Sequence, residues 1–143
     1  MVNQNKFQIL QNECSNCVKC SLSSTRNNVV FGRGNPHSKL FVIGEGPGQQ
    51  EDEQGLAFVG RAGKMLDSAF LSVGIDTNKD CYISNIVKCR PPNNRKPLAN
   101  EVKECMPWLN EQIELIKPKV IVLAGSTAVQ SYLNIDEPIS KLR

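Results

Sequence analysis

The chain contains 143 residues, of which 40% are hydrophobic and 22% are charged, and its formal net charge is +3. This length suits one globular domain and is short for two. No apolar run approaches the roughly 18 residues that a membrane-spanning helix needs, so the composition excludes such a span. The mild positive charge permits a nucleic-acid partner and is equally compatible with an ordinary solvated surface.

The N-terminal segment carries three of the six cysteines. It begins MVNQNKFQIL, which lacks the basic stretch and apolar run of a secretory signal, so we expect a cytoplasmic protein. In that reducing compartment, cysteines serve more often as metal ligands or buried thiols than as disulfides. Residues 5–22 are predicted to form a short helix or turn that contains Cys14, Cys17 and Cys20.

Apolar runs and helical spacing predict the next elements of the chain. Residues 40–44 (LFVIG) are typical of a strand buried on both faces and closed by glycine. A helix follows and ends at Gly74, and its apolar stripe is Met65, Leu66, Ala69, Phe70 and Val73. The β-branched and aromatic residues of 81–88 predict a second strand, and the Pro-Pro-Asn-Asn of 91–94 predicts a loop.

The remainder of the chain predicts a long helix, a third strand and a last helix. The long helix covers residues 100–116, and its buried stripe is Val102, Met106, Leu109, Ile113 and Ile116. Residues 119–125 (KVIVLAG) form the third buried strand, and Ser126 is expected to cap the final helix. This alternation predicts an α/β fold with a parallel sheet between helices, whose ligand crevice lies at the carboxyl ends of the strands.

The cysteines form two groups with metal-ligand spacing. Cys14, Cys17 and Cys20 make C-x2-C-x2-C, while Cys89 and Cys105 are separated by fifteen residues. Four thiolates from two such groups would complete one metal centre, and their spacing suits a structural zinc ion or an iron–sulfur cluster equally well. Unconnected buried thiols are the third reading. Cys81 opens a strand and is expected in the core.

Residues that could surround a flat ligand follow the first two strands. A glycine loop (Gly44 to Gly48) is followed by an acidic run at residues 51–53, and Phe58 lies beyond it. Each of these features has an ordinary alternative when it is taken singly. The glycine loop could bind a nucleotide phosphate, and the acidic run could be a solvated loop. Phe58 could be a core residue, and Asn85, at the end of the second strand, could form a turn. Basic residues on two loops, each an ordinary surface residue alone, together suit phosphate contacts: Arg61, Lys64, Arg90, Arg95 and Lys96.

Three motifs in this order resemble one family. The segments GEGPGQQEDEQGLAFVGRAGKML, NIVKCRPPNNRKP and CVKCSLSSTR are together similar to the iron–sulfur (family 4) uracil-DNA glycosylases of bacteria and archaea, over about residues 17–143. The resemblance implies one three-layer α/β/α domain, uracil-DNA glycosylase-like, over residues 1–143. It also implies a four-iron, four-sulfur cluster of structural role on Cys17, Cys20, Cys89 and Cys105, with segment 14–20 part of that site. Cys14 is left over, and its substitution for another ligand stays open.

The resemblance also implies what the site residues do. An enzyme that acts on a base holds it outside the stack in a pocket. Phe58 would stack on the uracil, and the Asn85 amide would bind its O4 and N3–H. Gly44, Gly46 and Pro47 would shape the loop against the base. Glu45 would be the catalytic acid together with Asn85, and Glu51 would line the uracil C5 edge. The implied reaction is hydrolysis of the N-glycosidic bond of uracil in DNA, as in base excision repair.

The sequence departs from the family at its C-terminal side. It stops at ISKLR, before the family's His-Pro-Ser loop, and His37 does not match that loop and is expected at the surface. We therefore expect the family's last strand and helix to be absent and the edge of the third strand to be uncovered. A truncated product, a fragment of a longer protein, or a split protein completed by a second chain would each give this end.

Three functions from different classes remain at this point. The first is uracil excision, with uracil-containing DNA as partner, no membrane, and a monomer unless a second chain completes it. The second is an inactive remnant or a metal-bearing module that binds nucleic acid without chemistry. The third is a zinc-stabilised domain of unrelated purpose.

Overall fold

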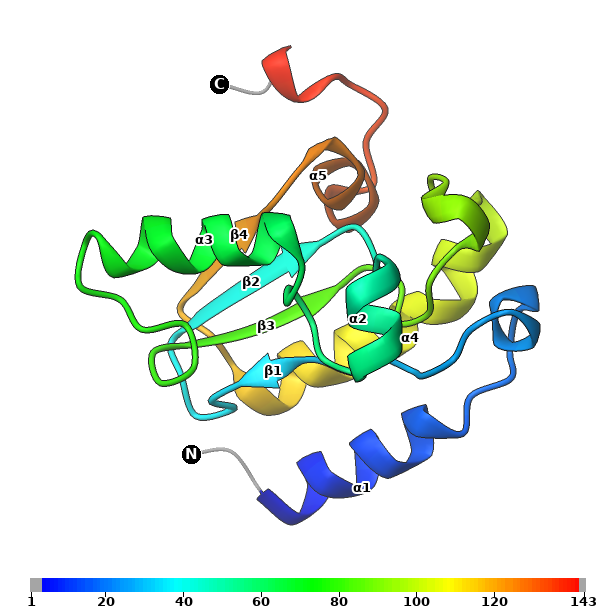
Figure 1. The fold of residues 1–143 in the computed structure, drawn as a ribbon, viewed down its shortest axis with the longest axis horizontal. Helices are drawn as coiled ribbons and strands as arrows, with labels where there is room; N and C mark the ends of the chain where they lie inside the picture. Colours follow the sequence, from blue (N-terminus) through cyan, green and yellow to red (C-terminus); the bar gives the residue numbers. More distant parts are fainter. Residues whose placement is uncertain (1–3, 142–143) are drawn as a thin grey trace.

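The structure is a computed structural model, and it describes residues 4–141, apart from the side chain of residue 139. A four-stranded sheet lies at its centre, with the strands in the order β1-β3-β2-β4 (Figure 1). The strands are β1 (Arg33–Gly34), β2 (Leu40–Gly44), β3 (Cys81–Asn85) and β4 (Val120–Leu123). The α-helices are α1 (Gln4–Ser15), α2 (Gln49–Gln54), α3 (Arg61–Leu71), α4 (Ala99–Ile116) and α5 (Ser126–Leu133). Short 3-10 turns cover Ser21–Ser24, Pro92–Asn94 and Ile139–Lys141.

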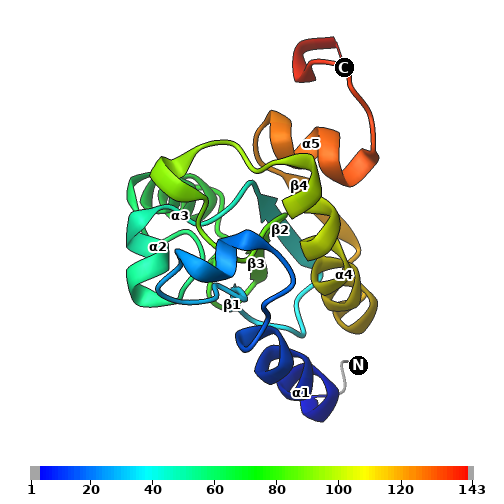
Figure 2. The ribbon, with the colours of Figure 1, turned by 90° about the vertical axis from the view of Figure 1, so that its right-hand side faces the viewer.

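Helices cover both faces of the sheet. Figure 2 shows the sheet between a layer with α2 and α3 and a layer with α4 and α5, while α1 packs beneath α4. The predicted three-layer α/β/α architecture is therefore confirmed. None of the helices described, which include the 18-residue α4, is long and apolar enough to cross a membrane.

The three predicted strands are parallel, as expected, but the sheet is mixed. β2 pairs in parallel with β3 on one side and with β4 on the other. β1 was not predicted, and it pairs antiparallel with β3, Arg33 opposite Ile83. A strand of two residues carries no periodic signal of its own, because it exists only through its neighbour.

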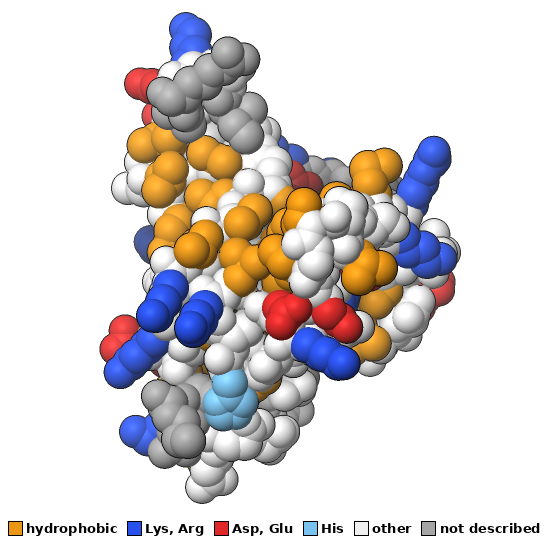
Figure 3. Space-filling model, turned by 90° about the vertical axis from the view of Figure 1, so that its left-hand side faces the viewer, with side chains coloured by type: hydrophobic (Ala, Val, Ile, Leu, Met, Phe, Trp, Pro, Cys, Tyr) orange, Lys and Arg blue, Asp and Glu red, His pale blue; other side chains and the backbone are white. Residues whose placement is uncertain are grey.

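The central strands are buried on both faces, as their apolar runs predict. Phe41 and Ile43 point to a core with α1 and α4, and Val42 points to a second core under α3. This period of two is the side-chain alternation of a strand. The prediction of a third buried strand at residues 119–125 is wrong for β4: this strand lies at an edge of the described sheet, Val120 is 55% exposed, and its other three residues are only partly buried. Figure 3 shows apolar side chains gathered on the face of the molecule viewed from the left of Figure 1.

Several helix predictions need correction. α1 contains Cys14, whereas Cys17 and Cys20 follow it in a turn. Ser126 was predicted to cap the last helix, but α5 starts at Ser126 itself, and its N-cap is Gly125, which makes no side-chain capping bond. In α3 only Gly63 is buried, and Met65 is 68% exposed, so the predicted stripe does not face the core as a whole.

In α4 the buried line is displaced by about one residue from the prediction. It consists of Glu101, Cys105, Leu109, Gln112 and Ile116. Val102, Met106 and Ile113 are partly buried beside it, and Leu109 and Ile116 were predicted. The apolar pattern missed Glu101 and Gln112, because their burial depends on polar partners rather than on apolar spacing. Arg95 and the Leu98 N–H bind Glu101, and Phe31 O accepts from Gln112 Nε2.

Candidate active site

The ends of β2 and β3 meet at one edge of the sheet. Gly44 is in register with Asn85, and the pairing continues past the strand ends. The Ile86 N–H donates to Gly44 O at 2.8 Å, and the Val87 N–H donates to Glu45 O at 3.2 Å. β3 was predicted to run to residue 88, and these two bonds keep its continuation beside the glycine loop. The glycine loop after β2 and the segment after β3 are therefore held together by main-chain hydrogen bonds.

Phe58 and Asn85 converge on Gly44. A Cβ at position 44 would lie 2.4 Å from Cζ of Phe58 and 2.6 Å from Oδ1 of Asn85, so only glycine leaves both side chains their places. Both side chains line a cavity of about 210 Å³. Its other lining residues are Gly46, Gly48, Glu51, Ala62 and Gly63.

The side-chain amide of Asn85 opens onto this cavity. Asn85 is 2% exposed as a residue and lines the cavity, and within residues 4–141 its amide forms no hydrogen bond with the protein. Its amide atoms are not sealed off, because Gln112 Oε1 is the only fully buried side-chain polar atom without a partner among the described residues. The amide is therefore available to bind a group that enters the cavity. The main-chain carbonyl of Asn85 accepts a bond from Lys88 Nζ at 2.7 Å.

The loop that carries Phe58 has an unusual backbone. Phe58 has φ +55°, in the left-handed region, which costs an L-residue roughly 1 kcal/mol or more. Glu51 holds this loop: its Oε2 accepts the N–H groups of Val59 and Gly60 at 2.9 and 2.7 Å. Its Oε1 accepts the Gly48 N–H at 3.0 Å, which connects the loop to the start of α2.

Gly63, in the first turn of α3, also packs against the loop that carries Phe58. A Cβ at position 63 would lie 1.9 Å from the carbonyl oxygen of Phe58, which is main chain and cannot swing aside. The first turn of α3 therefore approaches the Phe58 peptide at a distance that only glycine permits. Gly63 thus lets the start of α3 pack directly against the main chain of Phe58.

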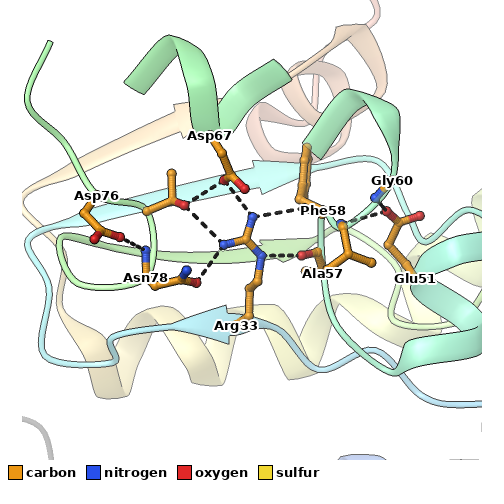
Figure 4. Close-up of polar contacts among 10 residues, drawn as sticks. Arg33, Glu51, Ala57, Phe58, Gly60, Asp67, Asp76 and Asn78 are labelled. Carbon is orange, nitrogen blue, oxygen red and sulfur yellow. Dashed lines mark hydrogen bonds and ion pairs between the residues drawn. The ribbon is translucent and has the colours of Figure 1, made fainter. Parts of the chain in front are cut away.

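Arg33 is the residue that sequence reasoning missed. Its Nε donates to Ala57 O at 2.6 Å and its Nη2 to Phe58 O at 3.0 Å (Figure 4). Its guanidinium also forms an ion pair with Asp67 at 2.9 Å, and its side chain is only 9% exposed. Arg33 stands between two glycines in a turn-like stretch, and nothing in that stretch indicates a contact with a loop 24 residues away.

The remaining predicted site residues lie around this cavity with different surroundings. Glu45 is half-buried and Pro47 is buried, and neither lines the cavity. Asp52, in the acidic run, is 1% exposed and accepts the N–H groups of Asn27 and Asn28 at 2.9 and 3.2 Å. The acidic run is thus helical and mostly engaged, rather than a solvated loop.

The basic residues predicted to contact DNA differ in their exposure and in whether an acidic residue of the protein already binds them. Arg61 and Lys64 are exposed on the first turn of α3, and Lys96 is also exposed. Arg95 donates two bonds of 2.8 Å to the Glu101 carboxylate, so its charge is compensated within the protein. These bonds from Arg95 hold the pKa of Glu101 below its ordinary value, against the opposing effect of burial.

Arg90 and His37 complete the list of predicted surface groups. Arg90 Nε donates to Asn94 Oδ1 at 2.7 Å. His37 is exposed, as expected, and Figure 3 shows its ring on the surface. Its Nε2 lies 3.1 Å from Oε1 of Gln4.

The two cysteine groups come together in space. One small pocket is lined by five thiols, those of Cys14, Cys17, Cys20, Cys89 and Cys105. Cys81 lies elsewhere, fully buried in the core under α3, as predicted. Within the described residues no three His, Cys, Asp or Glu side chains are arranged to hold a single metal ion.

The surroundings of these thiols suit the charge of bound thiolates. Trp108 Nε1 lies 3.3 Å from the Cys17 sulfur, the Lys88 N–H 3.1 Å from that of Cys105, and Arg26 Nη1 3.5 Å from that of Cys89. N–H donors to the sulfurs are the usual second contacts of a thiolate-bound metal group. Burial raises the pKa of Cys89 to about 11, so the free thiol is protonated at neutral pH.

Lys88 lies between the two sites. It is 1% exposed, and its Nζ donates to Ser84 Oγ and Asn85 O, both at 2.7 Å. It also lines the cysteine pocket. Burial lowers the pKa of Lys88 to about 8, partly offset by the nearby cysteines. Among the described residues, ion pairs form only at Arg33 and Arg95, so Lys88 has no carboxylate partner there, and the acidic groups nearest to it are the thiols of the cysteine pocket.

Comparison with known proteins identifies the family of this fold and site. Residues 31–142 match the family model described as the uracil DNA glycosylase superfamily. The chain belongs to this superfamily. It is 44% identical over 128 residues to the type-4 uracil-DNA glycosylase of Thermotoga maritima, which covers 90% of this chain and 66% of that protein. It is 45% identical over 123 residues to the type-4 enzyme of Archaeoglobus fulgidus, with 86% of this chain and 61% of that protein covered.

The chain spans only part of the length of the relatives that it matches. It covers between 53% and 66% of the length of the type-4 enzymes that it matches. A segment of the DNA polymerase of Bacillus phage SP01 is also similar, at 33% identity over 112 residues, which are 78% of this chain and 12% of that protein.

Proposed function

We propose that this chain carries out the base-excision chemistry of a type-4 uracil-DNA glycosylase, with uracil-containing DNA as its substrate. The observation that carries the proposal is the convergence of the Asn85 amide and the Phe58 ring on one cavity at Gly44, where the amide opens to the cavity without a protein hydrogen bond among the described residues. The cavity lies at the carboxyl ends of parallel strands, where ligands of such sheets bind.

The cavity suits one flat pyrimidine removed from the base stack. The Phe58 ring offers a face on which a base can stack, and such stacking contributes about 1–3 kcal/mol. The Asn85 amide both donates and accepts, so it matches the O4 acceptor and N3–H donor of uracil. Cytosine presents the opposite pattern at these two atoms. Discrimination therefore depends on the amide keeping one orientation in the complex.

Cleavage of the glycosidic bond leaves negative charge on the base and positive charge on the sugar. The glycine loop brings main chain close to the base, because Gly46 lines the cavity without a Cβ. N–H groups of that loop would stabilise charge that develops on uracil O2. We assign to Glu45 the carboxylate that favours the sugar cation or orients water. Glu51 is assigned to the wall of the pocket and to the support of the Phe58 loop.

We further propose that the cysteine pocket holds a four-iron, four-sulfur cluster. Cys17, Cys20, Cys89 and Cys105 would be its ligands, and the N–H donors to three of these sulfurs support this set. When bound, the cluster would be structural, joining the segment after α1 to the loop after β3. Zinc is the rival occupant. Metal analysis and a visible absorption band of the purified protein distinguish the two, and neither measurement depends on activity.

The phosphate backbone would contact the basic residues near the cavity. Arg61 and Lys64 begin the helix that follows the Phe58 loop, and Lys96 is exposed on the other loop. Arg90 and Arg95 are included with them, although Arg95 is paired with Glu101. A DNA substrate and reduced thiols would place this activity in the cytoplasm.

Incubation with uracil-containing single- and double-stranded DNA tests the proposal. We expect abasic product from the unaltered chain and none from thymine-containing DNA. Asn85→Ala should lower the rate by about 100-fold or more, the usual effect of removing one donor to a developing charge. The exposed Asn110→Ala is the matched control and should leave the rate unchanged. A folded, metal-loaded protein that forms no product, and whose salt-sensitive DNA binding Asn85→Ala leaves unchanged, would instead be a binding module.

A further inference from the structure

We propose that Arg33 is a positioning residue of the base pocket, which holds the Phe58 ring in its stacking orientation by binding the main chain on both sides of that residue. This inference rests on the proposed function, because it assumes that Phe58 stacks on the base. Arg33 does not line the cavity, so it can act on a ligand only through the loop.

The peptide group between Phe58 and Val59 is bound at both ends. Its oxygen accepts a bond from Arg33 Nη2 at 3.0 Å, and its N–H donates to Glu51 Oε2 at 2.9 Å. The preceding carbonyl, that of Ala57, accepts from Arg33 Nε at 2.6 Å. A cation thus lies on the carbonyl side and a carboxylate on the N–H side, which matches the dipole of the peptide. Rotation of this peptide would break both charge-assisted contacts.

This double contact explains how Phe58 keeps its left-handed backbone. A bulky residue at φ +55° is retained only where the surroundings determine it from several directions. This backbone sets the direction of the Phe58 Cα–Cβ bond, from which the ring can reach only the positions that the staggered χ1 rotamers allow. Without the contacts on the carbonyl side, the loop gains alternative conformations in which the ring leaves the wall beside Asn85.

The guanidinium is itself held in a fixed orientation. Its Nη1 donates to Thr77 Oγ1 at 3.2 Å and to Asn78 Oδ1 at 3.0 Å, and its Nη2 bonds to Asp67 at 2.9 Å (Figure 4). These partners come from α3 and the turn before β3. A planar fork with five donors can serve all of them and both carbonyls at once. A lysine ammonium at the same place cannot.

A double-mutant cycle tests whether Arg33 acts through Phe58. We expect Arg33→Lys to lower kcat/KM for uracil release from single-stranded DNA by about tenfold to 100-fold. In a Phe58→Ala background the same change should lower it by no more than about twofold, since the ring that it positions is gone. The matched control is Asn78→Ala, which removes a contact to the same guanidinium without touching the loop. Full losses in both backgrounds, or no loss from Arg33→Lys, would overturn the inference.

A second measurement keeps the inference testable if the unaltered chain releases no uracil, which would reject the proposed function alone. Amide hydrogen exchange at Val59 and Gly60 needs no activity. We expect exchange at least about tenfold faster in Arg33→Lys than in the unaltered chain, and no change in Asn78→Ala. Equal exchange in all three proteins would show that Arg33 does not hold this loop.

Discussion

Replacement of Glu51 by glutamine tests whether one carboxylate builds the base pocket. The carboxylate accepts three main-chain N–H groups at 2.7 to 3.0 Å, two from the Phe58 loop and one from the start of α2. Glutamine has nearly the same shape but only one acceptor oxygen. In either orientation its NH₂ group faces at least one N–H that now lacks an acceptor.

The expected cost follows from these three bonds. Hydrogen bonds to a charged group contribute about 1.5–3 kcal/mol each, and neutral ones about 1 kcal/mol. Glutamine loses one bond and weakens the others, and Glu51 is only half-buried, so we expect a loss of about 2–3 kcal/mol. For a chain of this size that lowers Tm by roughly 5–10 °C. A looser Phe58 loop should also lower kcat/KM for uracil about tenfold.

Thermal unfolding and uracil release provide the assay, with Glu53→Gln as the matched control. Glu53 lies in the same helix and is exposed, so the same substitution there should change Tm by less than about 2 °C. Equal Tm values for the two variants would refute the reasoning. Release of thymine by Glu51→Gln would show instead that Glu51 acts on selectivity at the C5 edge, rather than on the position of the loop.

Three further changes probe the rest of the molecule. Gly63→Ala should cost about 1–3 kcal/mol and reduce uracil release, since its Cβ meets the Phe58 carbonyl, although alanine is normally the better helix residue. Glu101→Gln should lower the free energy of unfolding at pH 7 by about 2 kcal/mol. Because the folded-state pKa of this carboxyl is lowered, the difference from wild type should shrink as the pH falls below about 4.3 in urea titrations. Cys14→Ala should retain iron and visible absorption, whereas Cys17→Ala should lose both.

Matched controls accompany these three predictions. Ser68→Ala, on the exposed face of α3, should keep or slightly raise stability, and a loss equal to that of Gly63→Ala would point to the helix rather than the loop. Glu111→Gln is exposed in α4 and should show no acid-dependent difference from wild type. Cys81→Ala should retain iron. If Cys14→Ala also lost iron, the assignment of Cys17 or Cys20 as a ligand would need exchange with Cys14.

Much of the site could be predicted because its parts lie at strand ends that local patterns reveal. The runs at Leu40–Gly44 and Cys81–Asn85 are apolar and continuous, and parallel strands bring their carboxyl ends to one edge. Gly44 and Asn85 follow directly from that rule. The cysteine spacings likewise predicted that the two groups lie together, and five of the six thiols line one pocket, while the metal centre itself stays a prediction.

Other parts were not predictable from short-range patterns. The basic loop residues were taken as one group, yet Arg95 is committed to Glu101, whose burial no apolar pattern indicates. The third thiol of the N-terminal group, Cys14, is completely buried at the same pocket, a position that spacing alone could not give. The position of Cys14 depends on the packing of distant segments, whereas Arg95 and Glu101 are only six residues apart and meet because the turn before α4 brings the guanidinium to the carboxylate.

The amino-acid sequence by itself determined the order of strands and helices, the two cysteine groups and the residues at the strand ends. It did so because apolar periodicity, glycine and spacing act over a few neighbouring residues. Only the tertiary structure decided that β1 joins the sheet antiparallel, and that Arg33 and Glu51 bind opposite ends of one peptide beside Phe58. Those contacts connect residues that are remote in sequence, and their strength comes from charge and geometry that exist only once the chain is folded.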